Sequence, residues 1–226
     1  MRKLFIFLMT AFFAVNVMAE NFPTEFLGIP VDGSKQEMIR KLRAKGFTYH
    51  SDDDCLSGEF NGTDVYIYIR TNNNKVYRVM VAEANTFSEG QIRIRFNNLM
   101  KQFKDNSKYI SSAINQDVIP KDEDISYEMA VNNKDYTGSF YQLSHPVDTT
   151  RMMVDARQFA QQLSSIYTQE EIETNAESIG EVSLLLAICK QFEKNNVWFK
   201  IMEYNGKYYI AIFYDNNYNK ANGEDL

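Results

Sequence analysis

The chain has 226 residues, with 24 lysines and arginines against 30 aspartates and glutamates, so its formal net charge is −6 at pH 7. Nucleic acids and anionic lipids are bound through positive surfaces, so this charge argues against either as the main partner. Aromatic residues make up 14% of the chain and only 4 prolines occur, a composition typical of an ordered globule rather than a disordered chain.

Residues 1–19 are predicted to form a cleavable secretory signal peptide. Arg2 and Lys3 give a positive start, and residues 4–15 are apolar apart from one threonine. This run is shorter than the roughly 20 apolar residues that a membrane-spanning helix needs. Small residues predict cleavage after Ala19, with a buried N-terminal helix and an uncleaved anchor as the alternatives.

After cleavage, the protein is expected to comprise residues 20–226, to be periplasmic or secreted, and not to span the membrane. The signal peptide carries two cations and no acid, so the remaining balance is 22 − 30 = −8. A chain of this length forms one large domain or two small ones. Polar, irregular residues between 105 and 125 suggest a division into subdomains 20–105 and 125–226.

Two helices are predicted in the first half of the chain, each from a capping box, in which the first residue and one three positions later satisfy free N–H groups. Ser34 and Glu37 open a helix that ends at Gly46 and has one apolar face: Met38, Ile39 and Leu42. Ser88 and Gln91 open the most regular helix, whose apolar residues recur at helical spacing: Ile92, Phe96, Leu99, Met100 and Phe103.

A third helix is predicted from the capping box of Thr168 and Glu171 to about Lys194, with a bend or break at Gly180. Its expected inward face consists of Val182, Leu185, Leu186, Cys189 and Phe192. The segment 150–166 is ambiguous between strand and helix.

Three hairpins are predicted between and after the helices. In the first, alternating residues from Val65 lead through an asparagine-rich turn into a strand of residues 76–83. A second pairs Tyr127–Val131 with Tyr136–Leu143. The third joins Val197–Tyr204 to Lys207–Asp215 through Asn205-Gly206, a dipeptide suited to a type I′ turn. This pattern predicts an α+β fold in which helices pack on one face of antiparallel sheet.

The cysteines Cys55 and Cys189 allow a disulfide in an oxidising compartment. Their patterns favour two free thiols, because Cys189 shares a helical stripe with core residues whereas Cys55 has the strand parity of solvent-facing residues.

No sequence motif for catalysis or cofactor binding is found, and neither a metal site nor a cofactor is expected. The two histidines, His50 and His145, lack partners at metal-ligand spacing. A dyad of Cys55 and His50 is disfavoured because Asp52–Asp54 would raise the pKa of the thiol. A pair of carboxylates for hydrolysis can be neither located nor ruled out among 30 acids.

The best candidate for function is a surface on the last hairpin. Pairing across Asn205-Gly206 gives one core-like face and an opposite face that is also apolar, whereas antiparallel sheets usually keep one face polar. The opposite face carries Trp198, Met202, Tyr209 and Phe213, and Tyr66 and Tyr68 of the first hairpin extend it. Either both faces are covered within the fold, or this one is exposed as a binding platform. Under the second hypothesis, Trp198→Ala weakens binding and leaves the thermal midpoint nearly unchanged.

Two segments resemble a group of exported Gram-negative bacterial proteins of unknown function: Phe26–Ser34, which opens the mature domain, and Tyr204–Asn216, which closes it. The layout also resembles the outer-membrane small-protein-A and β-lactamase-inhibitor-like folds. That resemblance implies a binding or assembly module rather than an enzyme.

We therefore expect a non-catalytic module that binds a protein or glycan of the cell envelope. The alternatives are a secreted hydrolase with a carboxylate pair and an inhibitor of a secreted enzyme.

Overall fold

The computed structural model describes residues 21–112, 118–166 and 168–221, without the side chains of residues 169–173. The predicted signal peptide and its cleavage site lie outside the described residues. Among the described helices, none combines the length and the apolar character needed to cross a bilayer.

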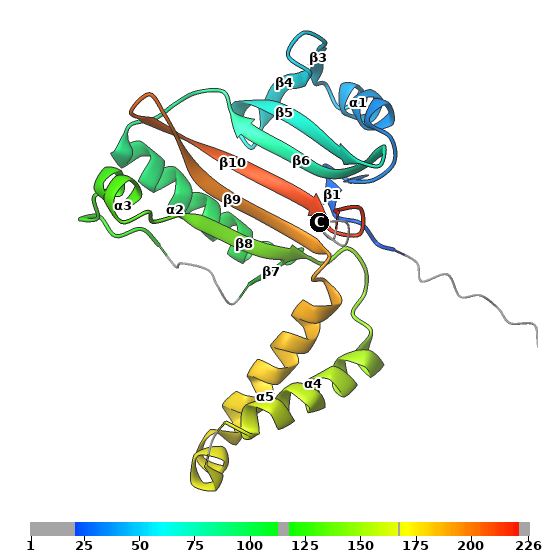
Figure 1. The fold of residues 1–226 in the computed structure, drawn as a ribbon, viewed down its shortest axis with the longest axis vertical. Coiled ribbons are helices and arrows are strands. Elements are labelled where there is room, and N and C mark those ends of the chain that lie inside the picture. The colour runs from blue at the N-terminus through cyan, green and yellow to red at the C-terminus, as the bar shows by residue number, and fades with distance from the viewer. Residues whose placement is uncertain (1–20, 113–117, 167, 222–226) are drawn as a thin grey trace, which may run out of the picture.

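An eight-stranded antiparallel sheet forms the centre of the molecule, in the order β3-β4-β5-β6-β10-β9-β8-β7 (Figure 1). Residues 48–83 contribute four neighbouring strands and residues 109–216 the other four, and the pairing of β6 with β10 joins the two sets into one sheet. Its strands are β3 (Thr48–His50), β4 (Cys55–Phe60), β5 (Thr63–Asn72), β6 (Lys75–Glu83), β7 (Tyr109–Ser111), β8 (Thr137–Gln142), β9 (Asn195–Tyr204) and β10 (Lys207–Asn216). A separate two-stranded sheet pairs β1 (Glu25–Phe26) with β2 (Ile29–Pro30).

Helices α1 (Lys35–Ala44) and α2 (Glu89–Asp105) begin at the predicted capping residues. The Ser34 side chain accepts a hydrogen bond from the Glu37 backbone N–H at 3.3 Å, and Gln91 Oε1 accepts one from the Ser88 backbone N–H at 3.0 Å. All five apolar residues predicted to face inward from α2 are buried.

Both helices pack on one face of the sheet, which we call the covered face. It is formed by alternate strand residues that share one core with α1 and α2, among them Ile67, Val81, Phe140, Phe199 and Ile212. Its centre is an aromatic cluster in which the Phe199 ring lies 5.2 Å from Phe96 and 5.4 Å from Phe103 of α2, measured between centroids. The predicted α+β architecture is confirmed.

The predicted turns of the first and third hairpins are confirmed. Asn73 and Asn74 adopt positive φ angles of 46° and 61° between β5 and β6, and Asn205 and Gly206 adopt 51° and 72° between β9 and β10. These conformations match the right-handed twist of the flanking strands.

The second predicted hairpin is wrong in its first strand. Residues Ile125–Val131 form helix α3, because the Asp124 side chain caps it by accepting a hydrogen bond from the Tyr127 N–H at 2.8 Å. The second half of the prediction corresponds to β8, which instead pairs with β7 and β9.

The ambiguous segment before residue 166 is helix α4 (Thr149–Ser164), which packs antiparallel to α5 (Gln169–Gln191). The two helices form a hairpin that projects away from the sheet (Figure 1). The irregularity in α5 lies at Asn175, with φ −112° and ψ 15°, rather than at Gly180. The expected inward orientation of Val182 and Leu185 is wrong, since these side chains are 45% and 43% exposed.

Candidate functional site

The strand register brings the predicted binding residues onto one side of the sheet. Phe213 pairs with Trp198 on β9 and with Met80 on β6, and Met80 pairs with Tyr68 on β5. Since directly opposed residues point to the same side, these four residues form a continuous row across four strands. Met202 opposite Tyr209 belongs to the same side. We call this side, opposite α1 and α2, the open face.

A second row of residues lies beside the first, and its two central side chains are small. It runs from Tyr66 through Ala82 and Ala211 to Lys200. Ala82 and Ala211 are the smallest side chains near the middle of the open face, and larger side chains surround them.

Ala82 and the larger side chains around it line a shallow hollow of about 540 Å³. Four tyrosines line it, one from β9, one from β10 and two from β5, together with Arg70 and Met80. Tyr66 and Tyr204 are 42% and 63% exposed. The lining residues are Tyr66, Tyr68, Arg70, Met80, Ala82, Glu83, Ala84, Thr86, Tyr204 and Tyr209.

Trp198 lies outside the hollow, in a cluster that satisfies its own polar groups. Its ring stacks on Phe213 at 4.0 Å between centroids, with an interplanar angle of 13°. Its Nε1–H donates to Asp215 Oδ2 at 3.0 Å. Asp215 also accepts two hydrogen bonds of 2.6 Å from Arg78, whose guanidinium lies 5.4 Å from the Trp198 centroid.

This arrangement changes the expectation for Trp198. Its indole N–H is bonded to a buried carboxylate and one ring face is covered, so truncation would remove both a hydrogen bond and packing. Trp198 therefore supports the open face, whereas Tyr66, Tyr204 and Tyr209 are the side chains around the hollow.

The open face carries charges of both signs. Arg70, Arg78 and Lys200 lie on it, Asp215 accepts two hydrogen bonds from Arg78, and Glu59 and Asp64 oppose each other on the same side. Lys200 also bonds Asp135 at 3.2 Å, and Arg70 is exposed beside the hollow. A ligand with acceptor oxygens or negative charge would find donors here as well as aromatic surface.

Both cysteines are free thiols. Cys55 has the predicted strand parity, opposite Tyr68 by the register of β4 and β5, but the expectation of solvent exposure is wrong because it is only 2% exposed. Burial, and then the charges of Asp53 and Asp54, raise the pKa of its thiol. The thiolate that a nucleophile needs is disfavoured.

His50 pairs with Cys55 across β3 and β4, but its Nε2 lies 2.7 Å from Ser57 Oγ. His145 lies between the rings of Phe22 and Phe192, at 4.5 and 4.7 Å. In the part of the chain that the structure describes, no three His, Cys, Asp or Glu side chains gather in a way that could hold a metal ion.

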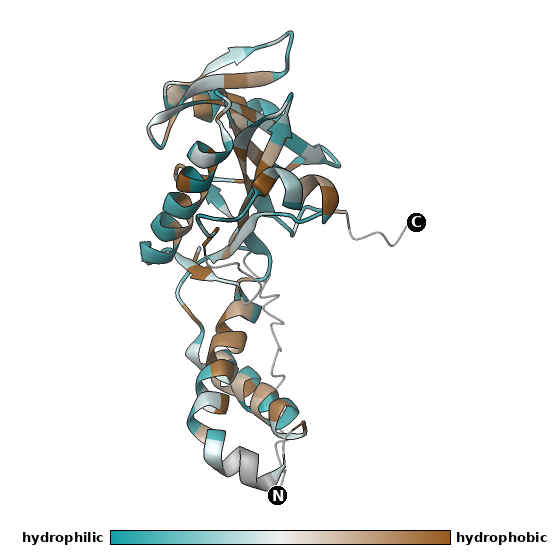
Figure 2. Ribbon diagram, turned by 90° about the vertical axis from the view of Figure 1, so that its left-hand side faces the viewer, coloured by the Kyte–Doolittle hydropathy of each residue, from teal (hydrophilic) through white to brown (hydrophobic). Residues whose placement is uncertain are grey.

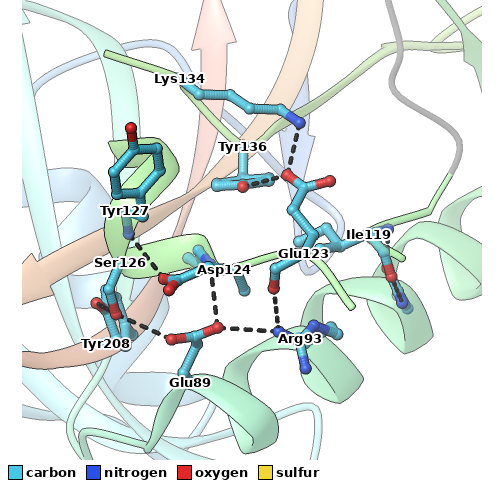
Figure 3. A network of polar contacts seen from close by, with 12 residues as sticks. Glu89, Arg93, Ile119, Glu123, Asp124, Ser126, Tyr127, Lys134, Tyr136 and Tyr208 are labelled. Carbon is cyan, nitrogen blue, oxygen red and sulfur yellow. Dashed lines mark hydrogen bonds and ion pairs between the residues drawn. The ribbon is translucent and has the colours of Figure 1, made fainter. Parts of the chain in front are cut away.

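The densest polar network lies on the side of the covered face, around two glutamates (Figure 3). Glu123 Oε1 accepts from Lys134 Nζ at 2.5 Å and from the Tyr136 hydroxyl. Glu89 accepts from Arg93 and from the backbone N–H of Ile125, at 2.9 and 3.0 Å. Its other oxygen accepts from Ser126 Oγ at 2.9 Å.

This network fastens the segment before α3 to α2 and to the residues just before β8, and the pKa of Glu123 does not suit acid catalysis. Burial alone would raise the pKa of the Glu123 carboxyl, but the hydrogen bonds from Lys134 and Tyr136 outweigh burial and lower it. A general acid at neutral pH needs a raised pKa. Each carboxylate is held by cations and N–H or O–H donors, as in a structural clasp.

Sequence reasoning missed part of the hollow. The sequence places Tyr204 at the end of a predicted strand and gives no signal of a role for Met80, Ala82 or Arg70. Strand alternation alone could have placed them on the side of Tyr66 and Tyr68. These residues lie beside β9 and β10 only because β6 pairs with β10. That pairing joins residues about 130 positions apart, so no local sequence pattern predicts it.

Comparisons of the chain with protein-family models, with curated proteins and with solved structures find no match.

Proposed function

We propose that this protein is an exported, non-catalytic binding module that recognises a protein or glycan of the bacterial cell envelope through its open face. The observation that carries this proposal is the hollow lined by four tyrosines on a side of the sheet opposite α1 and α2. Tyrosine combines a rigid apolar ring with a hydroxyl, so it contributes strongly to recognition at low cost in conformational entropy.

The two groups with shifted pKa values that were considered for catalysis favour recognition instead. The Cys55 thiol has a raised pKa and the Glu123 carboxyl a lowered one, so neither is prepared as a nucleophile or a general acid. Arg70 and the tyrosine hydroxyls offer donors to a ligand rich in oxygen atoms. Inhibition of a secreted enzyme would be one form of this binding, with the same face in the active-site cleft.

A protein partner can be tested by site-specific photo-cross-linking. A photoreactive phenylalanine analogue at Tyr66 should give an adduct of one size in living cells, and the same analogue at Tyr127 should not. Tyr127 is a matched control because it is 53% exposed and lies on α3. Excess mature wild-type protein should compete for the adduct in an envelope extract, and the Tyr209→Ala protein should not.

A glycan can be tested by fluorescence, because the single tryptophan of the chain, Trp198, lies on the same face. Titration with soluble peptidoglycan fragments or lipopolysaccharide oligosaccharides should change its emission, and Tyr66→Ala should weaken the interaction at least tenfold. Equal adducts from positions 66 and 127, together with unchanged emission for every glycan, would contradict the proposal. Turnover of an envelope polymer that is abolished by Glu89→Gln or Glu123→Gln would support the hydrolase instead.

A further inference from the structure

Carboxamide side chains hold distant backbone segments in this fold through pairs of hydrogen bonds, an arrangement that we call an amide clamp. In each clamp, the side-chain oxygen accepts from the N–H of one residue and the side-chain NH2 donates to the carbonyl of the same residue, at distances between 2.6 and 3.0 Å. The clamps join Asn97 to Ile119, Gln142 to Glu25 and Gln191 to Asp148. Each clamped residue lies outside a helix, where its N–H and C=O groups are free to bond a side chain.

Helix α2 carries further carboxamides on the side that faces the turn between β4 and β5. Asn98, Gln102 and Asn106, the last at the C-cap of the helix, follow one another at steps of four residues and form what we call the amide line. Asn98 is exposed, and in the part of the chain that the structure describes its carboxamide has no hydrogen-bond partner. Figure 2 shows hydrophilic and hydrophobic residues mixed along the helices beside the sheet, as expected for helices that keep one side in water.

The amide line forms one rim of a groove between α2 and the turn of β4 and β5. The groove consists of two adjoining cavities of about 140 and 400 Å³. Asn98 lines the smaller cavity, Asn106 the larger one and Gln102 both. Both cavities are also lined by Phe60, Asn61, Leu99 and Ile212. An apolar base with a few placed polar groups is the usual character of a ligand site.

The spacing of the amide line matches an extended peptide. Residues four apart in a helix lie about 6.0 Å apart along its axis. Alternate residues of an extended chain, whose N–H and C=O groups point to the same edge, repeat about every 6.7 Å. Successive carboxamides of the line can therefore meet alternate residues of a strand that lies along α2.

The charge of the groove also suits a peptide backbone. Its charged lining residues are Glu83 and Arg95, and Arg95 Nε donates to Glu83 Oε1 at 2.9 Å. This pair leaves the lining without net charge, which is complementary to an uncharged backbone rather than to an ionic ligand.

We propose that the groove binds an extended segment of another polypeptide, held by its backbone on the amide line. Asn98 and Gln102 bond the N–H and C=O groups of alternate peptide residues, as Asn97 bonds Ile119 on the other flank of the same helix. Every second side chain of the peptide points to the apolar base. Gln102 also accepts from Asn61 Nδ2 at 2.9 Å, and since both side chains are exposed, this bond is exchanged for bonds to the peptide. The groove lies on the covered side of the sheet, so the site is separate from the open face and its proposed function.

Fluorescence polarisation with synthetic peptides tests the class of ligand. The probes are labelled, uncharged decapeptides in which serine alternates with valine, leucine, phenylalanine or tyrosine, and at least one should bind the mature protein saturably. Methylation of the backbone nitrogen at every second residue removes the N–H groups from one edge of the peptide. Of the two methylated forms of a binding peptide, one should lose affinity roughly tenfold and the other should keep it. Absence of saturable binding for all four probes, or equal affinities of the two methylated forms, would overturn the proposal.

Substitutions test the location of the site. Asn98→Ala should raise the dissociation constant of a binding peptide roughly tenfold, because it removes two hydrogen bonds. Its thermal midpoint should not fall, since alanine suits an exposed helix position. Gln158→Ala, which removes an exposed carboxamide from α4, is the matched control and should bind as the wild type does. Unchanged affinity in Asn98→Ala would contradict the proposal, and so would loss of peptide binding in Tyr66→Ala, which would place the peptide at the hollow of the open face.

Discussion

The covered and open faces of the sheet come from the same strands and differ in the chemistry of their side chains. In β5, Val65, Ile67 and Ile69 point to the covered face and are at most 3% exposed, whereas Tyr66, Tyr68 and Arg70 point to the open face. Both sets are apolar over much of their surface. The covered set carries no polar atom that a helix would have to satisfy, whereas the open set has a polar group on every side chain. The comparison teaches that the polar ends of large side chains, more than their apolar area, distinguish the exposed side of a sheet.

The largest expected effect of a substitution lies on the covered face. Phe199 is fully buried among three other phenylalanine rings. Phe199→Ala should lower the free energy of unfolding by about 3–5 kcal/mol through lost transfer energy and the cavity left behind. Urea denaturation followed by circular dichroism would measure it. A loss below about 1 kcal/mol would mean that the two faces do not differ in the way described.

Trp198→Ala should have a smaller effect, although it also changes a large aromatic residue. The side chain is half-buried, stacks on Phe213 and donates to Asp215, so we expect a loss of about 2 kcal/mol. Trp198→Phe keeps the stacking and loses only the hydrogen bond, so its loss should be about 1 kcal/mol. A thermal midpoint unchanged in Trp198→Ala would show that the cluster contributes little to stability and would restore the simpler platform hypothesis.

The clasp around Glu123 should make stability depend on pH in the acidic range. Because the pKa of Glu123 is lower in the folded state, the carboxylate contributes stability at pH above its unfolded value of about 4.3. That contribution is lost as the pH falls through the folded-state pKa. Glu123→Gln should cost about 1 kcal/mol at pH 7, and the difference from the wild type should shrink below about pH 4. A constant difference across this range, measured by urea denaturation, would contradict the assignment.

The smallest effect on stability is expected around the hollow. Tyr209→Ala removes a partly exposed side chain at the hollow, and should lower the free energy of unfolding by roughly 0.5 kcal/mol or less. Its effect on partner binding should nonetheless be large. This separation of stability from binding is the sharpest difference between the faces, and a loss of stability comparable with that of Trp198→Ala would remove it.

Local sequence signals predicted most of the individual elements. The capping residues Ser34 and Ser88, the helical spacing from Ile92 to Phe103, and the Asn205-Gly206 turn were all correctly interpreted, because each depends on interactions within a few residues. The failures occurred where two structures compete for the same residues. The segment Ile125–Val131 has a strand-like composition, but the cap provided by Asp124 makes it a helix.

The helical hairpin shows a different limit. An apolar stripe with the spacing of Val182, Leu185 and Cys189 predicts that these side chains are buried, but the spacing does not indicate which element covers them. Within one chain, α4 packs on the opposite side, where Ser183 and Ala187 allow the two backbones to approach closely. The stripe is buried at Phe192 and exposed at Val182 and Leu185, so the predicted inward face is wrong for its outer part.

The sequence by itself determined the class of the fold, the starts of α1 and α2, the turns of two hairpins and the side to which the residues of those hairpins point. These depend on backbone geometry and on side chains that are close in the chain. Only the tertiary structure decided that β6 pairs with β10, and this pairing assembles the open face from two distant hairpins. It also decided that α5 leaves the sheet uncovered. Both outcomes depend on contacts between residues far apart in the chain. The free energy of such contacts is set by shape complementarity across the whole core, and no periodic sequence pattern predicts them.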